Sequence, residues 1–72
     1  MGFAGGDLMN RLRELRVVKR ITQFQLTLLT GIGQSKISMV ENDLLSPTED
    51  EKKRLAEVLG VKVRKIWKGN SA

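Results

Sequence analysis

The apolar residues of this 72-residue chain recur at helical spacing. Leu8, Leu12 and Leu15 lie three or four positions apart, which places them on one side of a helix, and Met9 and Val18 widen that stripe. Four later segments repeat the spacing, with inward positions at Leu26, Leu29, Ile37, Val40, Leu55, Val58, Leu59, Val61, Val63, Ile66 and Trp67. The pattern predicts an all-α protein, a compact bundle of five short helices around one core.

Capping residues and glycines divide this pattern into helices. Thr22 and Thr48 are suitable N-caps, because a hydroxyl can accept a hydrogen bond from an exposed amide of the next turn. Glu51, three positions after Thr48, completes a capping-box pattern. Gly31 and Gly60 stand where helices end, since the position after a helix commonly needs a left-handed backbone. The predicted helices are residues 8–19, 23–30, 34–42, 49–59 and 62–68.

The predicted domain organisation is simple. Residues 1–7 are glycine-rich and lack periodicity, so we expect a flexible N-terminal tail. Residues 8–69 form one domain, as the length of the chain suggests. The first ten residues lack the basic and apolar segments of a signal peptide, and no apolar run is long enough to span a bilayer. We expect a cytoplasmic protein that makes no contact with a membrane.

The composition excludes several kinds of chemical site and indicates the charge of the partner. The chain has no cysteine and no histidine, so disulfides, thiolate metal sites and the most common general base are all excluded. Its acidic residues form no cluster beyond one capping run, so we expect no catalytic residues, no metal site, no cofactor and no enzymatic activity. The net charge is +5, from 13 Lys+Arg against 8 Asp+Glu. This surplus favours a polyanionic partner.

Residues 22–42 carry the most informative constellation, two short helices joined by a glycine-bearing turn. A helix that enters the major groove of DNA needs a second helix to hold it at a fixed angle through a short turn. The inner side is apolar, with Leu26, Ile32, Ile37 and Val40. The outer side offers short or amide side chains that can reach base edges, namely Gln34, Ser35, Lys36 and Ser38. Double-stranded DNA is therefore the predicted partner.

The chain resembles the lambda-repressor-like, Cro-type helix-turn-helix family. The resemblance lies in the motif TQxxL at residues 22–26 and the motif GIxQSxISxVEN at residues 31–42. It extends through Pro47 and the segment LAEVLGV at residues 55–61, and so covers about residues 8–67. The resemblance implies a helix-turn-helix at residues 23–42 in a sequence-specific transcriptional regulator, most simply a repressor. Since a lone module of this size contacts little DNA, we expect it to act by occupancy, as a homodimer on a palindromic operator.

The resemblance also implies roles for individual residues. Gln34 and Ser35 lie at the N-terminal end of the recognition helix, where relatives contact bases, and Ser38 and Met39 lie further along the same side. Gln23 and Asn42 match positions that bind phosphate in relatives. In some relatives, residues at the positions of Arg16 and Glu41 form a partly buried salt bridge that joins the first helix to the recognition helix.

Four positions depart from the family pattern. Thr27 stands where alanine is usual, so the helices must cross further apart or the hydroxyl must bond back to its own helix. Asp43 stands where glycine is usual and puts a negative charge near the DNA side. Lys62 replaces the usual Ser or Asp cap of the last helix. Phe24 occupies a position that is usually polar, and we expect it to be partly buried against the tail or the first helix.

Two further questions stay open at the level of the sequence. Residues 55–67, together with Leu44 and Leu45, are the predicted dimer seam, although the two leucines could instead insert into the core. An alternative function is an antitoxin-like protein-interaction module whose main partner is another protein. The apolar residues Phe3, Phe24, Leu44 and Leu45 would then carry the contact.

Overall fold

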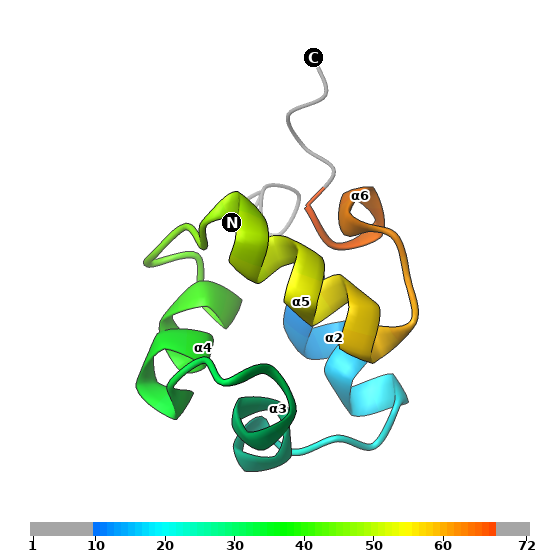
Figure 1. Ribbon diagram of the computed structural model, residues 1–72, viewed down its shortest axis with the longest axis horizontal. Coiled ribbons are helices and arrows are strands. Elements are labelled where there is room, and N and C mark those ends of the chain that lie inside the picture. Colours follow the sequence, from blue (N-terminus) through cyan, green and yellow to red (C-terminus); the bar gives the residue numbers. More distant parts are fainter. Residues whose placement is uncertain (1–9, 68–72) are drawn as a thin grey trace, which may run out of the picture.

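The structure is a computed structural model that describes residues 10–67 (Figure 1). The described helices are α2 (Leu12–Val18), α3 (Gln23–Thr30), α4 (Gln34–Glu41), α5 (Glu49–Leu59) and α6 (Val63–Ile66). Residues 10–67 contain no strand. Over these residues the predicted all-α fold of five short helices is confirmed.

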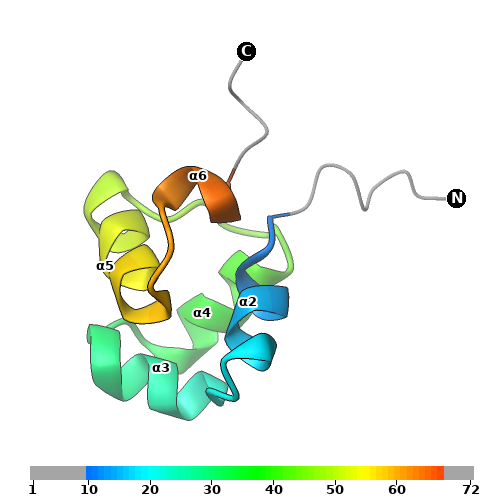
Figure 2. The same cartoon turned by 90° about the vertical axis from the view of Figure 1, so that its right-hand side faces the viewer.

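Seven apolar side chains are almost completely buried at the centre of the bundle. They come from every helix and comprise Leu12, Leu26, Ile37, Val40, Leu55, Leu59 and Ile66. Contacts between elements are most numerous where α3 packs on α4 and on α5. At the other end of the molecule α6 lies beside the start of α2 (Figure 2), where the backbone N–H of Arg11 donates to the carbonyl oxygen of Ile66 at 3.0 Å. The buried faces of α3 and α4 are therefore packed against the core of the bundle.

Local capping sets the ends of α3 and α5. The hydroxyls of Thr22 and Thr48 each accept a hydrogen bond from the backbone N–H three residues on. In turn, the side chains of Gln25 and Glu51 accept from the backbone N–H groups of Thr22 and Thr48. Two capping boxes therefore form, each of which satisfies amide groups that the first turn of a helix leaves unpaired. Gly31, at the end of α3, has φ +81°, a conformation that side chains with a Cβ rarely adopt.

Two inward assignments from the sequence are wrong. Leu29 is 60% exposed and Val18 is 67% exposed. The inner face of α3 is set by Leu26 and Thr30, which are four residues apart and buried, so Leu29 falls to one side of it. Val18 falls outside the inner face of α2 in the same way, because that face is set by Leu12 and Leu15.

The first and last helices are shorter than predicted within the described residues. The helix expected over residues 8–19 runs from Leu12 to Val18, while residues 8 and 9 and the predicted tail lie outside the described residues. The last helix, expected over residues 62–68, is a single turn from Val63 to Ile66. Lys62 is its N-cap and makes no side-chain cap hydrogen bond, in keeping with the replacement of the usual capping residue.

Candidate nucleic-acid interface

The turn between α3 and α4 is held by hydrogen bonds and by one buried side chain. The hydroxyl of Thr30 donates to the carbonyl oxygen of Leu26 at 2.7 Å and accepts from the backbone N–H of Ile32 at 3.1 Å. The side chain of Ile32 is 5% exposed and belongs to the core. Because the turn is anchored on both sides of Gly31, α4 is held at a fixed angle to α3.

The exposed face of α4 carries short polar side chains and one methionine. Gln34, Ser35 and Met39 are exposed, and Ser38 is half-buried. Ile37, Val40 and Glu41 are buried on the opposite side of the helix. A helix of eight residues with one face anchored in the core and the other free has the form that major-groove recognition requires.

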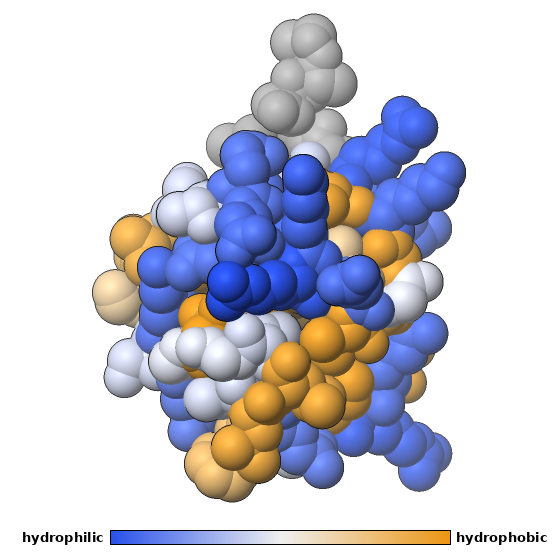
Figure 3. Space-filling view, viewed as in Figure 1, coloured by the Kyte–Doolittle hydropathy of each residue, from blue (hydrophilic) through white to orange (hydrophobic). Residues whose placement is uncertain are grey.

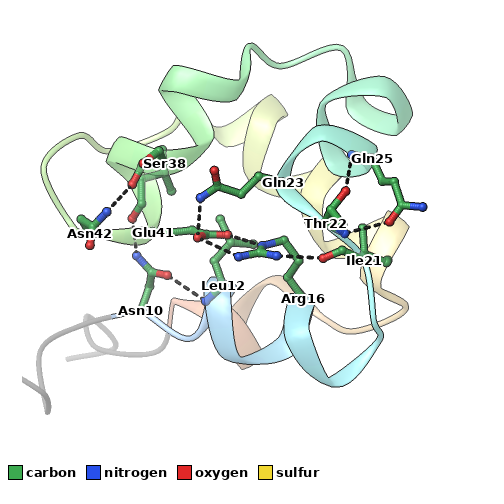
Figure 4. A network of polar contacts seen from close by, with 11 residues as sticks. Asn10, Leu12, Arg16, Ile21, Thr22, Gln23, Gln25, Ser38, Glu41 and Asn42 are labelled. Carbon is green, nitrogen blue, oxygen red and sulfur yellow. Dashed lines mark hydrogen bonds and ion pairs between the residues drawn. The ribbon is translucent and has the colours of Figure 1, made fainter.

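A buried ion pair joins α2 to the C-terminal end of α4 (Figure 4). The Nε of Arg16 donates to Oε2 of Glu41 at 2.6 Å, and its Nη2 donates to Oε1 at 3.3 Å. Nη1 of the same guanidinium donates to the carbonyl oxygen of Ile21 at 2.8 Å. The Glu41 side chain is only 2% exposed, and this two-point contact makes it a rigid link between the helices.

Gln23 and Asn42 already have partners within the protein. Nε2 of Gln23 donates to Oε1 of Glu41 at 3.0 Å, so Gln23 belongs to the same network as the ion pair (Figure 4). Nδ2 of Asn42 donates to the carbonyl oxygen of Ser38 at 2.8 Å. A primary amide has two N–H donors, so each side chain keeps one for another acceptor. Their roles as phosphate ligands stay predictions.

Lys36 is directed away from the other polar residues of α4. Its Nζ lies 2.7 Å from Oε2 of Glu51, in the first turn of α5. The hydrogen bond from Lys36, and then the one from the Thr48 backbone, hold the pKa of the Glu51 carboxyl below its usual range. The structure thus brings Gln34, Ser35 and Met39 together on a free surface but ties Lys36 to a neighbouring helix.

Two comparisons place this geometry among known proteins. A family model described as helix-turn-helix matches residues 12–66, which contain all five described helices. The chain belongs to the lambda-repressor-like, Cro-type helix-turn-helix family. As a member, it is a DNA-binding transcriptional regulator.

Among solved structures, the chain is similar to the restriction-modification controller protein C.AhdI from Aeromonas hydrophila. The two chains are 33% identical, the similarity covers 76% of this chain and 83% of the controller, and the TM-score is 0.73. A search of curated proteins found no significant match. No helix in the described part of the chain has the length and apolar character needed to cross a membrane.

Asp43 occupies the position, just after the recognition helix, at which the family usually has glycine. Asp43 itself adopts φ +57°, a left-handed conformation that aspartate tolerates better than most residues. Asn10 holds its carboxylate through the backbone N–H at 3.3 Å and through Nδ2 at 3.0 Å. Nδ2 also donates to the carbonyl oxygen of Val40 at 2.7 Å. The negative charge is therefore fixed at the end of the recognition helix.

Thr27 departs from the family pattern without any compensating bond. Its Oγ1 is buried and has no hydrogen-bond partner among the described residues. The hydroxyl does not bond back to its own helix, whereas that of Thr30, three residues further along α3, does. The second of the two alternatives for Thr27 is therefore wrong, and the first, a wider crossing of α3 and α4, stays a prediction.

Three features near the interface were not predicted from the sequence: the contacts of Asn10, the backbone conformation of Arg20 and the ion pair of Lys36. Asn10 is the clearest, and a signal for it existed: Oδ1 accepts from the N–H of Leu12 at 2.8 Å, a turn that asparagine commonly forms two residues ahead of a helix. Arg20, with φ +60°, gave no signal, since arginine is not a residue that favours this backbone. The tie between Lys36 and Glu51 depends on how α4 and α5 pack and could not be found from spacing.

The apolar residues outside the core are more exposed than expected. Phe24 is 57% exposed, and the tail against which it could pack lies outside the described residues. Leu44 is 74% exposed and does not insert into the core, and Leu45 is 37% exposed. On α3, Leu28 is 67% exposed, and Figure 3 shows a continuous hydrophobic surface over this helix. The bundle thus presents apolar surface beside its polar recognition face.

Proposed function

We propose that this protein is a cytoplasmic, sequence-specific repressor that binds a palindromic operator as a homodimer through the major groove. The observation that carries the proposal is the exposed polar face of α4 on a helix whose other face is anchored in the core. A helix held in this way can present the same side chains to every site that it meets. Occupancy of the operator is the simplest mode of regulation for a helix presented in this way.

Base recognition is assigned to the exposed residues of α4. Gln34 can bond an adenine edge through both ends of its amide, and Ser35 and Ser38 can bond several bases. Met39, 40% exposed, offers an apolar contact that suits a thymine methyl group. Each of these contacts is weak alone, and specificity comes from their sum over two half-sites.

Gln23 and Asn42 are proposed to bind the DNA backbone. Gln23 is the first residue of α3, where the helix dipole and the backbone N–H groups favour a phosphate. Phosphate contacts carry little sequence information. We therefore expect Gln23→Ala to weaken binding to all sequences by a similar factor.

A lone module of this size covers few base pairs, which supports a symmetric dimer. In residues 55–67, Leu55, Leu59 and Ile66 are buried within the protomer and are unavailable for a seam. Val58, Val61, Val63 and Trp67 are only partly buried. We propose that these four residues, with Leu44 and Leu45, form the dimer contact.

Selection of binding sites from random duplex DNA tests the proposal directly. The wild-type protein should enrich one sequence with two-fold symmetry, and Gln34→Ala should lose the preference at one base pair of each half-site by about 1–3 kcal/mol. Enrichment of no sequence, or an unchanged preference in Gln34→Ala, would rule out the assignment of the recognition helix. The similarity to C.AhdI makes the DNA beside a restriction–modification gene pair the first natural sequence to examine.

The alternative function, a protein-interaction module, is favoured by one observation. Phe24, Leu28 and Leu29 are all more than half exposed along one helix. Exposed apolar patches often mark protein contacts. Salt dependence separates the two functions, because phosphate contacts make affinity for random duplex fall steeply with salt. Absence of binding to random duplex at low salt would favour a protein partner.

A further inference from the structure

We propose that Glu51 limits the DNA affinity of the recognition helix by holding Lys36 as an internal ion-pair partner. This inference rests on the proposed function, and it assigns a role in DNA binding to a residue of α5. Glu51 would not touch DNA. It would act by withholding one positive charge from the phosphate backbone.

The geometry fixes the carboxylate on both sides. Oε2 of Glu51 accepts from Nζ of Lys36 at 2.7 Å, while Oε1 accepts from the backbone N–H of Thr48 at 2.9 Å. The N–H of Glu51 in turn donates to Oγ1 of Thr48 at 3.1 Å. The Glu51 side chain is 16% exposed. Glu51 therefore cannot follow Lys36 outward, and Lys36 must leave it to reach another acceptor.

Lys36 stands at the edge of the DNA-facing surface. Successive residues of a helix are turned by about 100°, so Lys36 lies one step round α4 from Ser35, which faces away from the core. The side chain of Lys36 is 38% exposed, and its flexible stem allows the ammonium group to move. A phosphate beside the recognition helix and the carboxylate of Glu51 can therefore compete for the same ammonium group.

This competition has a measurable consequence. Each lysine that neutralises a phosphate releases condensed counterions, and the slope of log affinity against log salt becomes steeper by about 0.9. A lysine already paired with a carboxylate inside the protein adds nothing to that slope. The wild-type slope should therefore lack the contribution of Lys36, although the residue lies on the recognition helix.

The substitution Glu51→Gln removes the ion pair and keeps the helix cap. Glutamine serves equally well in a capping box, because its carbonyl oxygen can accept the bond from the Thr48 N–H. The NH2 group, which then takes the place of Oε2, is a donor and cannot accept from Lys36. Binding of the full chain to a random-sequence duplex, measured by fluorescence anisotropy between 50 and 200 mM salt, should gain about 0.9 in slope, about a 3.5-fold larger loss of affinity across that range.

Glu49→Gln is the matched control. Glu49 lies in the same first turn, is 83% exposed and sits 3.5 Å from Lys52, so its loss removes the same negative charge without freeing Lys36. Lys36→Gln should leave the slope unchanged in the wild type and should abolish the gain in the Glu51→Gln background. Thermal melting of each variant confirms that the fold is intact.

The outcomes separate the two proposals. Equal slopes for Glu51→Gln and Glu49→Gln, or a shallower slope for Lys36→Gln alone, overturn the role of Glu51 and leave the proposed function standing. A wild-type protein that shows no salt-dependent affinity for duplex DNA overturns the proposed function itself.

Discussion

Glu41 is the residue on which the interface depends most. It accepts hydrogen bonds from Arg16 and from Gln23, and so links the first helix, the first residue of α3 and the end of the recognition helix. Its side chain is 2% exposed and that of Arg16 is 12% exposed. Removing one partner of such a buried pair strands the other charge, which costs more than the pair contributes when intact.

We therefore expect Glu41→Gln to lower the free energy of unfolding by about 3 kcal/mol. Urea denaturation followed by circular dichroism measures this change. Glu14→Gln is the control, because Glu14 pairs with Arg11 on the surface, where the side chains are 60% and 34% exposed. Surface ion pairs contribute little to stability, so this variant should lose much less than Glu41→Gln. Similar losses in both variants would contradict a structural role for the buried pair.

At the scale of single residues, sequence reasoning depended on whether a motif pairs distant positions. Arg16 and Glu41 could be paired in advance because the family pattern links them, and the structure places them 2.6 Å apart. Asn10 and Asp43, 33 positions apart in sequence, have no such pattern. Their contact follows from how α2 meets the end of α4, which only the packed bundle determines.

Among the elements, the contact between α4 and α5 is sensitive to pH. Lys36 and the Thr48 backbone lower the pKa of Glu51 in the folded state below the ordinary value of 4.5. A depressed carboxyl pKa adds stability that is complete above the unfolded pKa and is lost as the pH falls through the folded pKa. The contact should therefore stabilise the protein at neutral pH and weaken below about pH 4.5.

The difference in urea midpoint between wild type and Glu51→Gln measures this effect. We expect the wild type to be the more stable at pH 7 and the difference to shrink as the pH is lowered to 3. Glu49→Gln should show a smaller change over the same range, because the carboxylate of Glu49 is 83% exposed and lies 3.5 Å from Lys52. A difference that does not vary with pH would show that the ionised carboxylate is not what stabilises the contact.

For α3, the sequence predicts the ends of the helix better than its buried face. Residues 23–30 were predicted with their ends correct, because Thr22 and Gly31 mark them chemically. The inner face was assigned wrongly, because both Leu29 and Thr30 lie about one turn from Leu26 and only Leu29 is apolar. The structure buries Thr30, whose hydroxyl is satisfied by the turn, and leaves Leu29 exposed. A hydrophobic pattern cannot identify a polar residue that is buried because a turn satisfies it.

For the whole molecule, the arrangement of exposed apolar surface distinguishes a dimer seam from a partner site. Leu44, 74% exposed, lies on the loop after the recognition helix, whereas Leu28, 67% exposed, lies on α3. Both can be changed without disturbing the core. They therefore form a matched pair for testing which surface joins two protomers.

We expect Leu44→Ser to raise the dimer dissociation constant about tenfold or more, since burial of a leucine contributes roughly 1.5–3 kcal/mol. Leu28→Ser should leave the dimer unchanged. Sedimentation velocity over a range of concentrations measures both. If Leu28→Ser dissociates the dimer and Leu44→Ser does not, the dimer contact lies on α3 and residues 55–67 do not form it.

The buried hydroxyl of Thr27 bears on how long each molecule survives in a cell. A buried polar group without a partner costs about 1–3 kcal/mol, so Thr27→Ala should stabilise the fold by about 1 kcal/mol, which thermal denaturation would show as a higher midpoint. A gain of that size lowers the unfolded fraction roughly fivefold, and proteases act mainly on unfolded chains. If the protein acts by occupancy, as proposed, Thr27 would then shorten its lifetime and lower the number of copies available to bind DNA.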